Sequence, residues 1–182
     1  RAGHHGVSAG TEAEHGRDSS AILVTTSERV AEATAARLQA ILDETTNSRS
    51  GVVAEVFGAE GLGAIVVCDT LTDAVALVND YAPEHMVVKC SKENEAAVLR
   101  DIRNAGEILL GEYTPFTAGN YAIGITAVLP TNGYARSVSG VTARDMVKVS
   151  TIGRLDRDAL DVLRPTLREI AAAEGLPFHG RA

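Results

Sequence analysis

Glu84 and His85 are the residues whose types and spacing most directly suggest chemistry. Pro83 precedes them and an apolar run, residues 86–88, follows them. A proline disfavours helix at the residue before it, so a preceding helix ends there and the pair lies at the start of a buried strand. A carboxylate and an imidazole in this setting can share proton transfer near neutral pH. The structural alternative is a strand-initial Glu beside a capping His at a solvated edge.

Glu12 and His15 form a second candidate pair, within residues 11–16. Residues three apart share one face of a helical turn, and this spacing suits two ligands of a single metal ion. The alternative is a short, exposed helical turn that Gly16 ends. Taken alone, the pair favours that alternative.

The composition restricts the class of protein. The 182 residues suit one domain, or one domain with a tail, and suffice for a substantial core. The formal charge of −7 argues against nucleic acid as the main partner, and no apolar run approaches membrane-spanning length. Nothing at the start resembles a signal peptide. Cys68 and Cys90 lie in apolar runs, so we expect them to be reduced core residues rather than a disulfide. Reduced cysteines are typical of the cytoplasm, where we expect this protein.

Elements that could position both pairs alternate between residues 20 and 110. Short β-branched and apolar runs predict strands at 21–26, 52–57, 64–68, 86–90 and 108–110. Apolar residues at helical spacing predict helices at 28–45, from a capping box at 70–73 to before Pro83, and at 92–104 after a Ser91 cap. This order is typical of a parallel sheet covered by helices, with its sites at the carboxyl ends of strands. No G-x-G-x-x-G segment follows a strand, so we expect no dinucleotide site within this chain.

The alternation stops at residue 111. Residues 111–140 combine glycines and prolines with several aromatic side chains, which predicts a loop packed over a site. We therefore divide the chain into a mobile N-terminus (1–10), an α/β domain carrying the site (11–140) and a helical tail (141–182).

Two helices are expected in the tail. Thr142 should cap one that continues through Val149, and the last should begin near Asp156 and be kinked or split at Pro165. The residues after Gly175 have little apolar material to fold against, so we expect them to pack on another subunit.

Five segments in one order make the chain similar to a known family. It resembles the C-terminal part of histidinol dehydrogenase, the zinc enzyme that oxidises histidinol to histidine in two NAD-dependent steps. The segments are residues 12–16, 81–85, 117–121, 128–131, and 171–174 with His179. The resemblance implies an incomplete Rossmann-like α/β fold with a parallel sheet and flanking helices, followed by a helical tail that forms a homodimer.

The resemblance also implies residue roles. Glu84 would activate water for the second oxidation, and His85 would be the general acid/base for the substrate's hydroxyl proton. The zinc ligands would be Glu12, His15, Asn120 and His179. Glu174 would bind the substrate's amine, and His85 and Asn120 would also contact the substrate. His179 and Glu174 would reach into the partner subunit's site, and NAD would bind outside this chain.

Three residues depart from the family pattern. Glu12 stands where the family usually has Gln, and Asn120 stands where it usually has Asp, so the formal charge of the ligand set is unchanged. Ala127 stands where the family usually has a His that touches the substrate. Losing a polar partner typically changes substrate preference by a few kcal/mol, which favours another small amino alcohol or a polyol over histidinol.

The family's first half, with its nicotinamide-binding domain, has no counterpart in these residues. The sequence is then a fragment of a longer protein, which we favour, or a half-enzyme that pairs with another chain. A third reading is a non-catalytic dimerisation or small-ligand-binding module derived from the family.

Overall fold

The computed structural model describes residues 11–44 and 49–181. The chain divides into two units, one that extends to Thr142 and one that begins at Ala143. The segment 1–10, expected to be mobile, lies outside the described residues. No helix among those described is long and apolar enough to cross a membrane.

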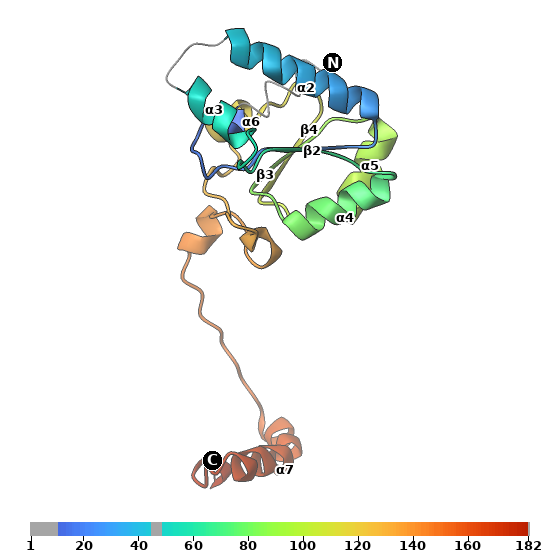
Figure 1. Cartoon of the computed structure of the whole chain (residues 1–182). Helices are drawn as coiled ribbons and strands as arrows, with labels where there is room; N and C mark the ends of the chain where they lie inside the picture. Colours follow the sequence, from blue (N-terminus) through green and yellow to red (C-terminus); the bar gives the residue numbers. More distant parts are fainter. Residues whose placement is uncertain (1–10, 45–48, 182) are drawn as a thin grey trace. The chain divides into compact units, whose positions relative to one another are not determined.

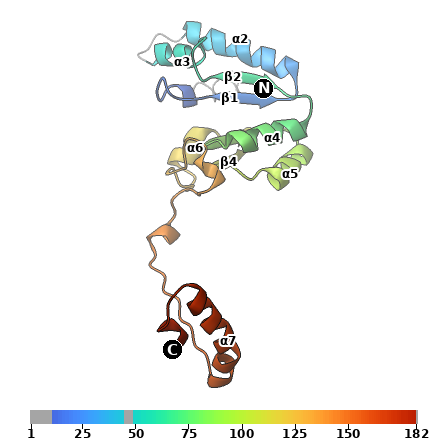
Figure 2. The same ribbon diagram turned by 60° about the horizontal axis from the view of Figure 1, so that its bottom comes forward.

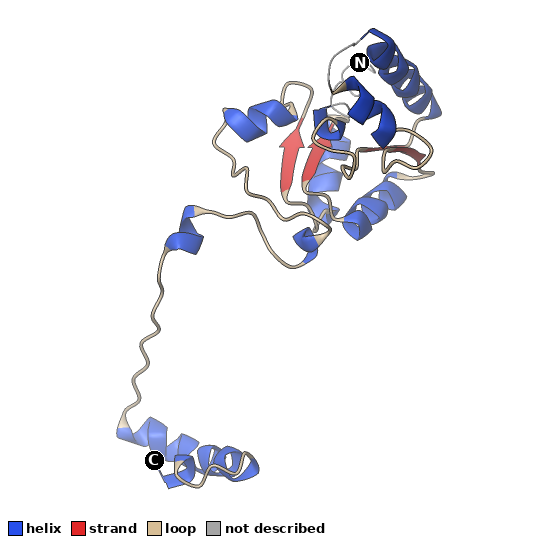
Figure 3. Cartoon of the chain, turned by 60° about the vertical axis from the view of Figure 1, so that its left-hand side comes forward, coloured by secondary structure: helices blue, strands red, loops and turns tan. Residues whose placement is uncertain are grey.

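Two pairs of parallel strands form the centre of the first unit (Figures 1 and 3). β1 (Ile22–Thr25) pairs with β2 (Ala64–Val67), and β3 (His85–Val88) pairs with β4 (Glu107–Leu110). Each strand falls within a predicted run or extends it by one residue, and the predicted α/β fold class is confirmed. The described strands form two separate pairs rather than one continuous sheet.

Helices cover the strands as the apolar spacing predicts. α2 (Glu28–Glu44) and α4 (Leu71–Tyr81) lie on opposite sides of the β1–β2 pair (Figure 2). α5 (Lys92–Asp101) begins where the Ser91 hydroxyl accepts a hydrogen bond from the Asn94 N–H, and the Thr70 hydroxyl caps α4 in the same way. These caps satisfy backbone donors that a helix leaves unpaired at its start.

The predicted strand at 52–57 is wrong, because these residues belong to the helix α3 (Ser50–Val56). Val53 and Val56 are three apart and both buried, packed with Ala13 and Ala21. A short apolar run fits a strand or one face of a helix equally well, and tertiary packing selects the helix here. Cys90 is exposed, so the expectation that it lies in the core is also wrong.

The segment 111–140 is not a loop throughout. It contains α6 (Phe116–Tyr121) and the short 3-10 helix η1 (Tyr134–Arg136). Phe116 and Gly119 are buried and three apart, so one face of α6 packs inward. The six residues of α6 are too few to show a clear helical periodicity in a segment rich in glycine and proline.

The second unit consists of η2 (Ala143–Met146), α7 (Arg157–Ala173) and η3 (His179–Arg181). Only η2 forms where a helix through Val149 was expected, because Val147 and Val149 are exposed and gain no burial there. α7 is not split at Pro165, and Asp156 caps its start.

The residues after Gly175 fold back on α7, contrary to expectation. The Leu176 N–H donates to the Ala171 carbonyl at 2.8 Å, and Ala171 is buried. Gly175 permits this turn with φ +70°. Packing on another subunit stays a prediction.

Asn79 ties α4 to the segment that leads from α5 into β4. Its side chain accepts from the Arg103 and Asn104 N–H groups at 2.7 and 3.2 Å and donates to the Asp101 carbonyl at 3.0 Å. Asn79→Ala should lower the free energy of unfolding by about 1–3 kcal/mol, because these backbone groups lose their partner. Urea unfolding measures this change in free energy, and Asn94→Ala, at an exposed residue of α5, is the control. Equal effects of the two substitutions would contradict the role of Asn79.

Candidate active site

The β3–β4 pairing brings Glu84, His85 and Glu107 together. His85 and Glu107 are the first residues of their strands and are register partners, so their side chains project to the same face. The Glu107 N–H donates to the Glu84 carbonyl at 2.9 Å. This places the group at the amino ends of the strands, whereas the alternating pattern predicted sites at the carboxyl ends.

The turn before β3 is sterically constrained. Ala82 ends α4 in the left-handed conformation, with φ 55°, and is almost fully buried. A non-glycine residue adopts this conformation at a cost of roughly 1–2 kcal/mol. Across from it, a Cβ at Gly106 would lie 2.5 Å from the Glu84 carbonyl oxygen, so only glycine allows β4 to approach this closely.

His85 lies between two carboxylates. Its Nδ1 is 2.5 Å from Oε1 of Glu107, and its Nε2 is 3.5 Å from Oε1 of Glu84. The side chains of Glu107, His85 and Glu84 are 2%, 12% and 37% exposed, so the group grades from buried to solvated. Phe116 of α6 contacts the imidazole edge-on, with ring centroids 5.7 Å apart. This buried, ordered setting does not match a capping His at a solvated edge.

Glu12 belongs to the same group. Burial raises the pKa of the Glu12 carboxyl above its ordinary value, while His85 and His15 act to lower it and Glu84 and Glu107 to raise it. The charges of these four side chains therefore act on the Glu12 carboxyl. One of its oxygens, Oε1, is buried without a hydrogen-bond partner among the described residues.

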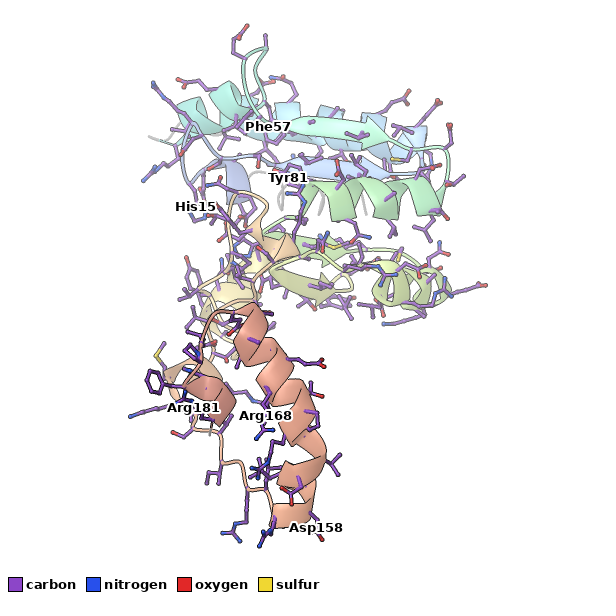
Figure 4. All side chains as sticks on the ribbon, turned by 90° about the horizontal axis from the view of Figure 1, so that it is seen from below. His15, Phe57, Tyr81, Asp158, Arg168 and Arg181 are labelled. Atoms are coloured by element: carbon purple, nitrogen blue, oxygen red, sulfur yellow. The ribbon has the colours of Figure 1, made fainter. Side chains whose placement is uncertain are left out.

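A hydrogen bond between the Ser20 and Tyr81 hydroxyls joins the segment bearing Glu12 and His15 to the end of α4. Figure 4 shows His15 on the segment before β1 and Tyr81 on α4, directed toward β1. Because Tyr81 stands just ahead of Ala82 in the chain, this bond links the Glu12–His15 turn to the start of β3.

Asn120 approaches from α6. Its Oδ1 is buried and has no hydrogen-bond partner in the described part of the chain. The preceding residue, Gly119, lies against Glu107, since a Cβ there would be 3.0 Å from Glu107 Oε2. Buried unpaired acceptors such as Glu12 Oε1 and Asn120 Oδ1 require a compensating donor or cation.

The described residues form an incomplete donor set for a metal ion. The residues that the structure describes contain no group of three His, Cys, Asp or Glu side chains able to hold a metal. Glu12 and His15 would supply two such ligands, and Asn120 would add a carbonyl oxygen, which also suits a divalent cation. The expected fourth ligand, His179, begins η3 in the second unit, where Glu174 follows the end of α7.

The structure adds one residue that the sequence analysis did not identify, Glu107, and it places Ala127. Glu107 was missed, although an acidic residue between Gly106 and an apolar run was a detectable signal. Ala127 is exposed and lies three residues before Pro130, whose ring would be 3.1 Å from a Cβ at Gly106. The segment carrying the altered position thus runs beside the site.

A solved structure has the same architecture. The crystal structure of histidinol dehydrogenase from Elizabethkingia anophelis matches with a TM-score of 0.85 and 29% identity, over 100% of this chain and 40% of that one. The fold thus defines an α/β protein like that dehydrogenase.

Sequence comparison then names the family. The histidinol dehydrogenase family model matches residues 10–182. The chain is 40% identical over 172 residues to the histidinol dehydrogenase of Aliivibrio fischeri and 40% identical over 171 residues to that of Synechocystis sp.. Each match covers 94% of this chain and 38% of the relative. The chain belongs to the histidinol dehydrogenase family and spans about two fifths of the length of these relatives.

The raised pKa of Glu12 predicts a pH-dependent effect on stability. A carboxyl whose pKa is higher in the folded state than in the unfolded one contributes stability below the unfolded value of 4.5, and this contribution is lost as the pH rises through the folded value. In metal-free protein, the free energy of unfolding of Glu12→Gln should therefore increase relative to wild type between about pH 4 and pH 8.

Urea unfolding across that range, with chelator present, measures the difference. Glu14→Gln is the matched control, because Glu14 is exposed on the same turn. A difference between Glu12→Gln and wild type that stays constant with pH would contradict the burial of this carboxyl.

Proposed function

We propose that this chain forms the metal- and substrate-binding part of an enzyme that oxidises an amino alcohol to an amino acid through the aldehyde, with NAD as hydride acceptor. Oxidation of L-histidinol to L-histidine is the family reaction. The observation that carries the proposal is His85, held between Glu107 and Glu84 beside the buried unpaired oxygens of Glu12 and Asn120.

Zinc is the metal that we propose for the site. Its ligands would be Glu12, His15, Asn120 and His179 of the partner subunit in a homodimer. Zinc accepts carboxylate oxygen and imidazole nitrogen readily, and when bound it would polarise the substrate's hydroxyl. The two buried oxygens without partners support this assignment because a cation would satisfy both.

His85 is the proposed general acid/base. Removing the hydroxyl proton is necessary before the carbon can release a hydride. The imidazole is mostly buried, which excludes bulk water, yet its Nε2 lies toward the more exposed Glu84. Glu84 is the proposed base for the water that converts the aldehyde to the acid, and its 37% exposure allows water to reach it.

The remaining contacts concern substrate and cofactor. Glu174 would bind the substrate's amine across the subunit interface, and Asn120 would contact the substrate beside the metal. NAD would bind outside this chain, within the part of the family's length that it does not span. A cytoplasmic location stays a prediction.

The substrate would be a small amino alcohol or a polyol other than histidinol. Ala127 leaves the segment beside the site without the imidazole that usually stands there in the family. A polar partner of this kind discriminates between substrates by a few kcal/mol. Another small amino alcohol or a polyol would therefore fit this chain better than histidinol.

Glu84→Gln in the full-length protein tests the proposal. Gln keeps the size of the side chain but cannot take a proton from water, so aldehyde oxidation should fall about 10²–10⁴-fold while alcohol oxidation changes little. Single-turnover rates with alcohol and with aldehyde separate the two steps.

The control is Glu93→Gln, an exposed residue of α5, which should leave both steps unchanged. Equal loss of the two steps in Glu84→Gln would contradict the assigned role. A wild-type protein that binds amino alcohols but oxidises none would favour the non-catalytic ligand-binding module.

A further inference from the structure

Glu107 has no role in the reaction proposed above, yet it is the most buried charged side chain of the site, with 2% of the side chain exposed. A carboxylate loses its hydration when it is buried, and this loss is costly unless a charged or hydrogen-bonded partner compensates. The structure offers one such partner to Glu107 Oε1, the Nδ1 of His85 at 2.5 Å.

The backbone fixes this pair. Register pairing sets Glu107 opposite His85, and the hydrogen bond from the Glu107 N–H to the Glu84 carbonyl anchors the start of β4. The paired backbones therefore hold the two side chains close together before their hydrogen bond forms. A pre-positioned pair of this kind loses little conformational entropy when its hydrogen bond forms.

The absence of a side chain at Gly119 leaves space for the Glu107 carboxylate. A Cβ at Gly119 would lie 3.0 Å from Glu107 Oε2 and 3.3 Å from the methyl groups of Leu109. Oε2 has no hydrogen-bond partner among the described residues. The Glu107 carboxylate therefore directs its hydrogen bonding to the imidazole.

An ionised carboxylate can only accept a hydrogen bond, so the Nδ1 that it contacts must carry the hydrogen. The other ring nitrogen, Nε2, is then left with its lone pair free to take a proton. Nε2 is the nitrogen that lies 3.5 Å from Glu84, at the more solvated end of the group.

We infer that Glu107 is a positioning residue that holds His85 as the Nδ1–H tautomer and so makes Nε2 the proton-accepting nitrogen. The consequence for catalysis rests on the proposed function. In the alcohol step the hydroxyl proton would pass to Nε2, and the nicotinamide would accept the hydride. Glu107 keeps its charge, gives up no proton, and stabilises the imidazolium that forms.

The tautomer can be measured without any activity. Long-range ¹H–¹⁵N spectra of histidine-labelled protein distinguish a protonated from an unprotonated ring nitrogen at a pH where the ring is neutral, and a His85→Gln variant assigns the signals. Wild type should show His85 as Nδ1–H. Glu107→Gln should raise the Nε2–H fraction, because an amide can donate as well as accept.

The matched control is Glu95→Gln, which removes the charge of another buried glutamate, on α5 and paired with Lys92. It should leave the His85 tautomer as in wild type. A wild-type His85 in the Nε2–H form, or a tautomer that Glu107→Gln does not change, would overturn the inference. Where Glu107→Gln does not fold, the wild-type spectrum alone decides.

Kinetics of the full-length protein test the consequence. Hydrogen-bond partners of metal-bound imidazoles are typically worth about 10–100-fold in activity. By analogy, kcat for alcohol oxidation should fall about 10–100-fold in Glu107→Gln while KM changes little. Glu107→Asp keeps the charge and should recover part of this loss. An unchanged kcat would overturn the catalytic consequence. A wild-type protein inactive on amino alcohols would count against the proposed function, and the tautomer would still decide the inference.

Discussion

The pairing of β3 with β4 is the constraint on which the rest of this site depends. Two backbone hydrogen bonds join residues 83 and 84 to residues 106 and 107 just where the strands begin. They place an imidazole and a buried carboxylate on one face, and they require glycine at position 106. α6 then covers this face through Phe116 and Gly119.

Burial of several acidic groups around one imidazole is costly, and the cost has to be compensated. Burial, Glu84 and Glu107 raise the pKa of Glu12, and His85 and His15 act to lower it. The imidazole satisfies one oxygen of Glu107, but the other oxygen of Glu107, Glu12 Oε1 and Asn120 Oδ1 are buried acceptors without partners among the described residues. A site of this composition is suited to a cation, which supports the proposed metal.

Much of the first unit could be predicted from sequence because its signals are local. The caps at Thr70 and Ser91 and the apolar runs of the strands depend on neighbouring residues alone. The residues 52–57 could not be assigned, because packing of Val53 and Val56 against Ala13 and Ala21 decides between helix and strand. Family membership, read from five short segments in one order, is confirmed by the family model over residues 10–182.

The site itself was only partly accessible to sequence reasoning. Glu84 and His85 were noticed because they adjoin Pro83, but their contact with Glu107 depends on strand register, which no local pattern reveals. The group also lies at the amino ends of its strands, unlike the usual site in open sheets. The assigned zinc and substrate roles follow from the resemblance, and they stay predictions.

The most direct test is a crystal structure of the full-length, zinc-loaded protein with anomalous data collected on both sides of the zinc absorption edge. We predict one zinc peak per subunit, contacted by Glu12, His15 and Asn120 together with His179 of the partner subunit. A protein that takes up no zinc, or a zinc peak bound away from Glu12 and His15, would contradict the proposed metal site.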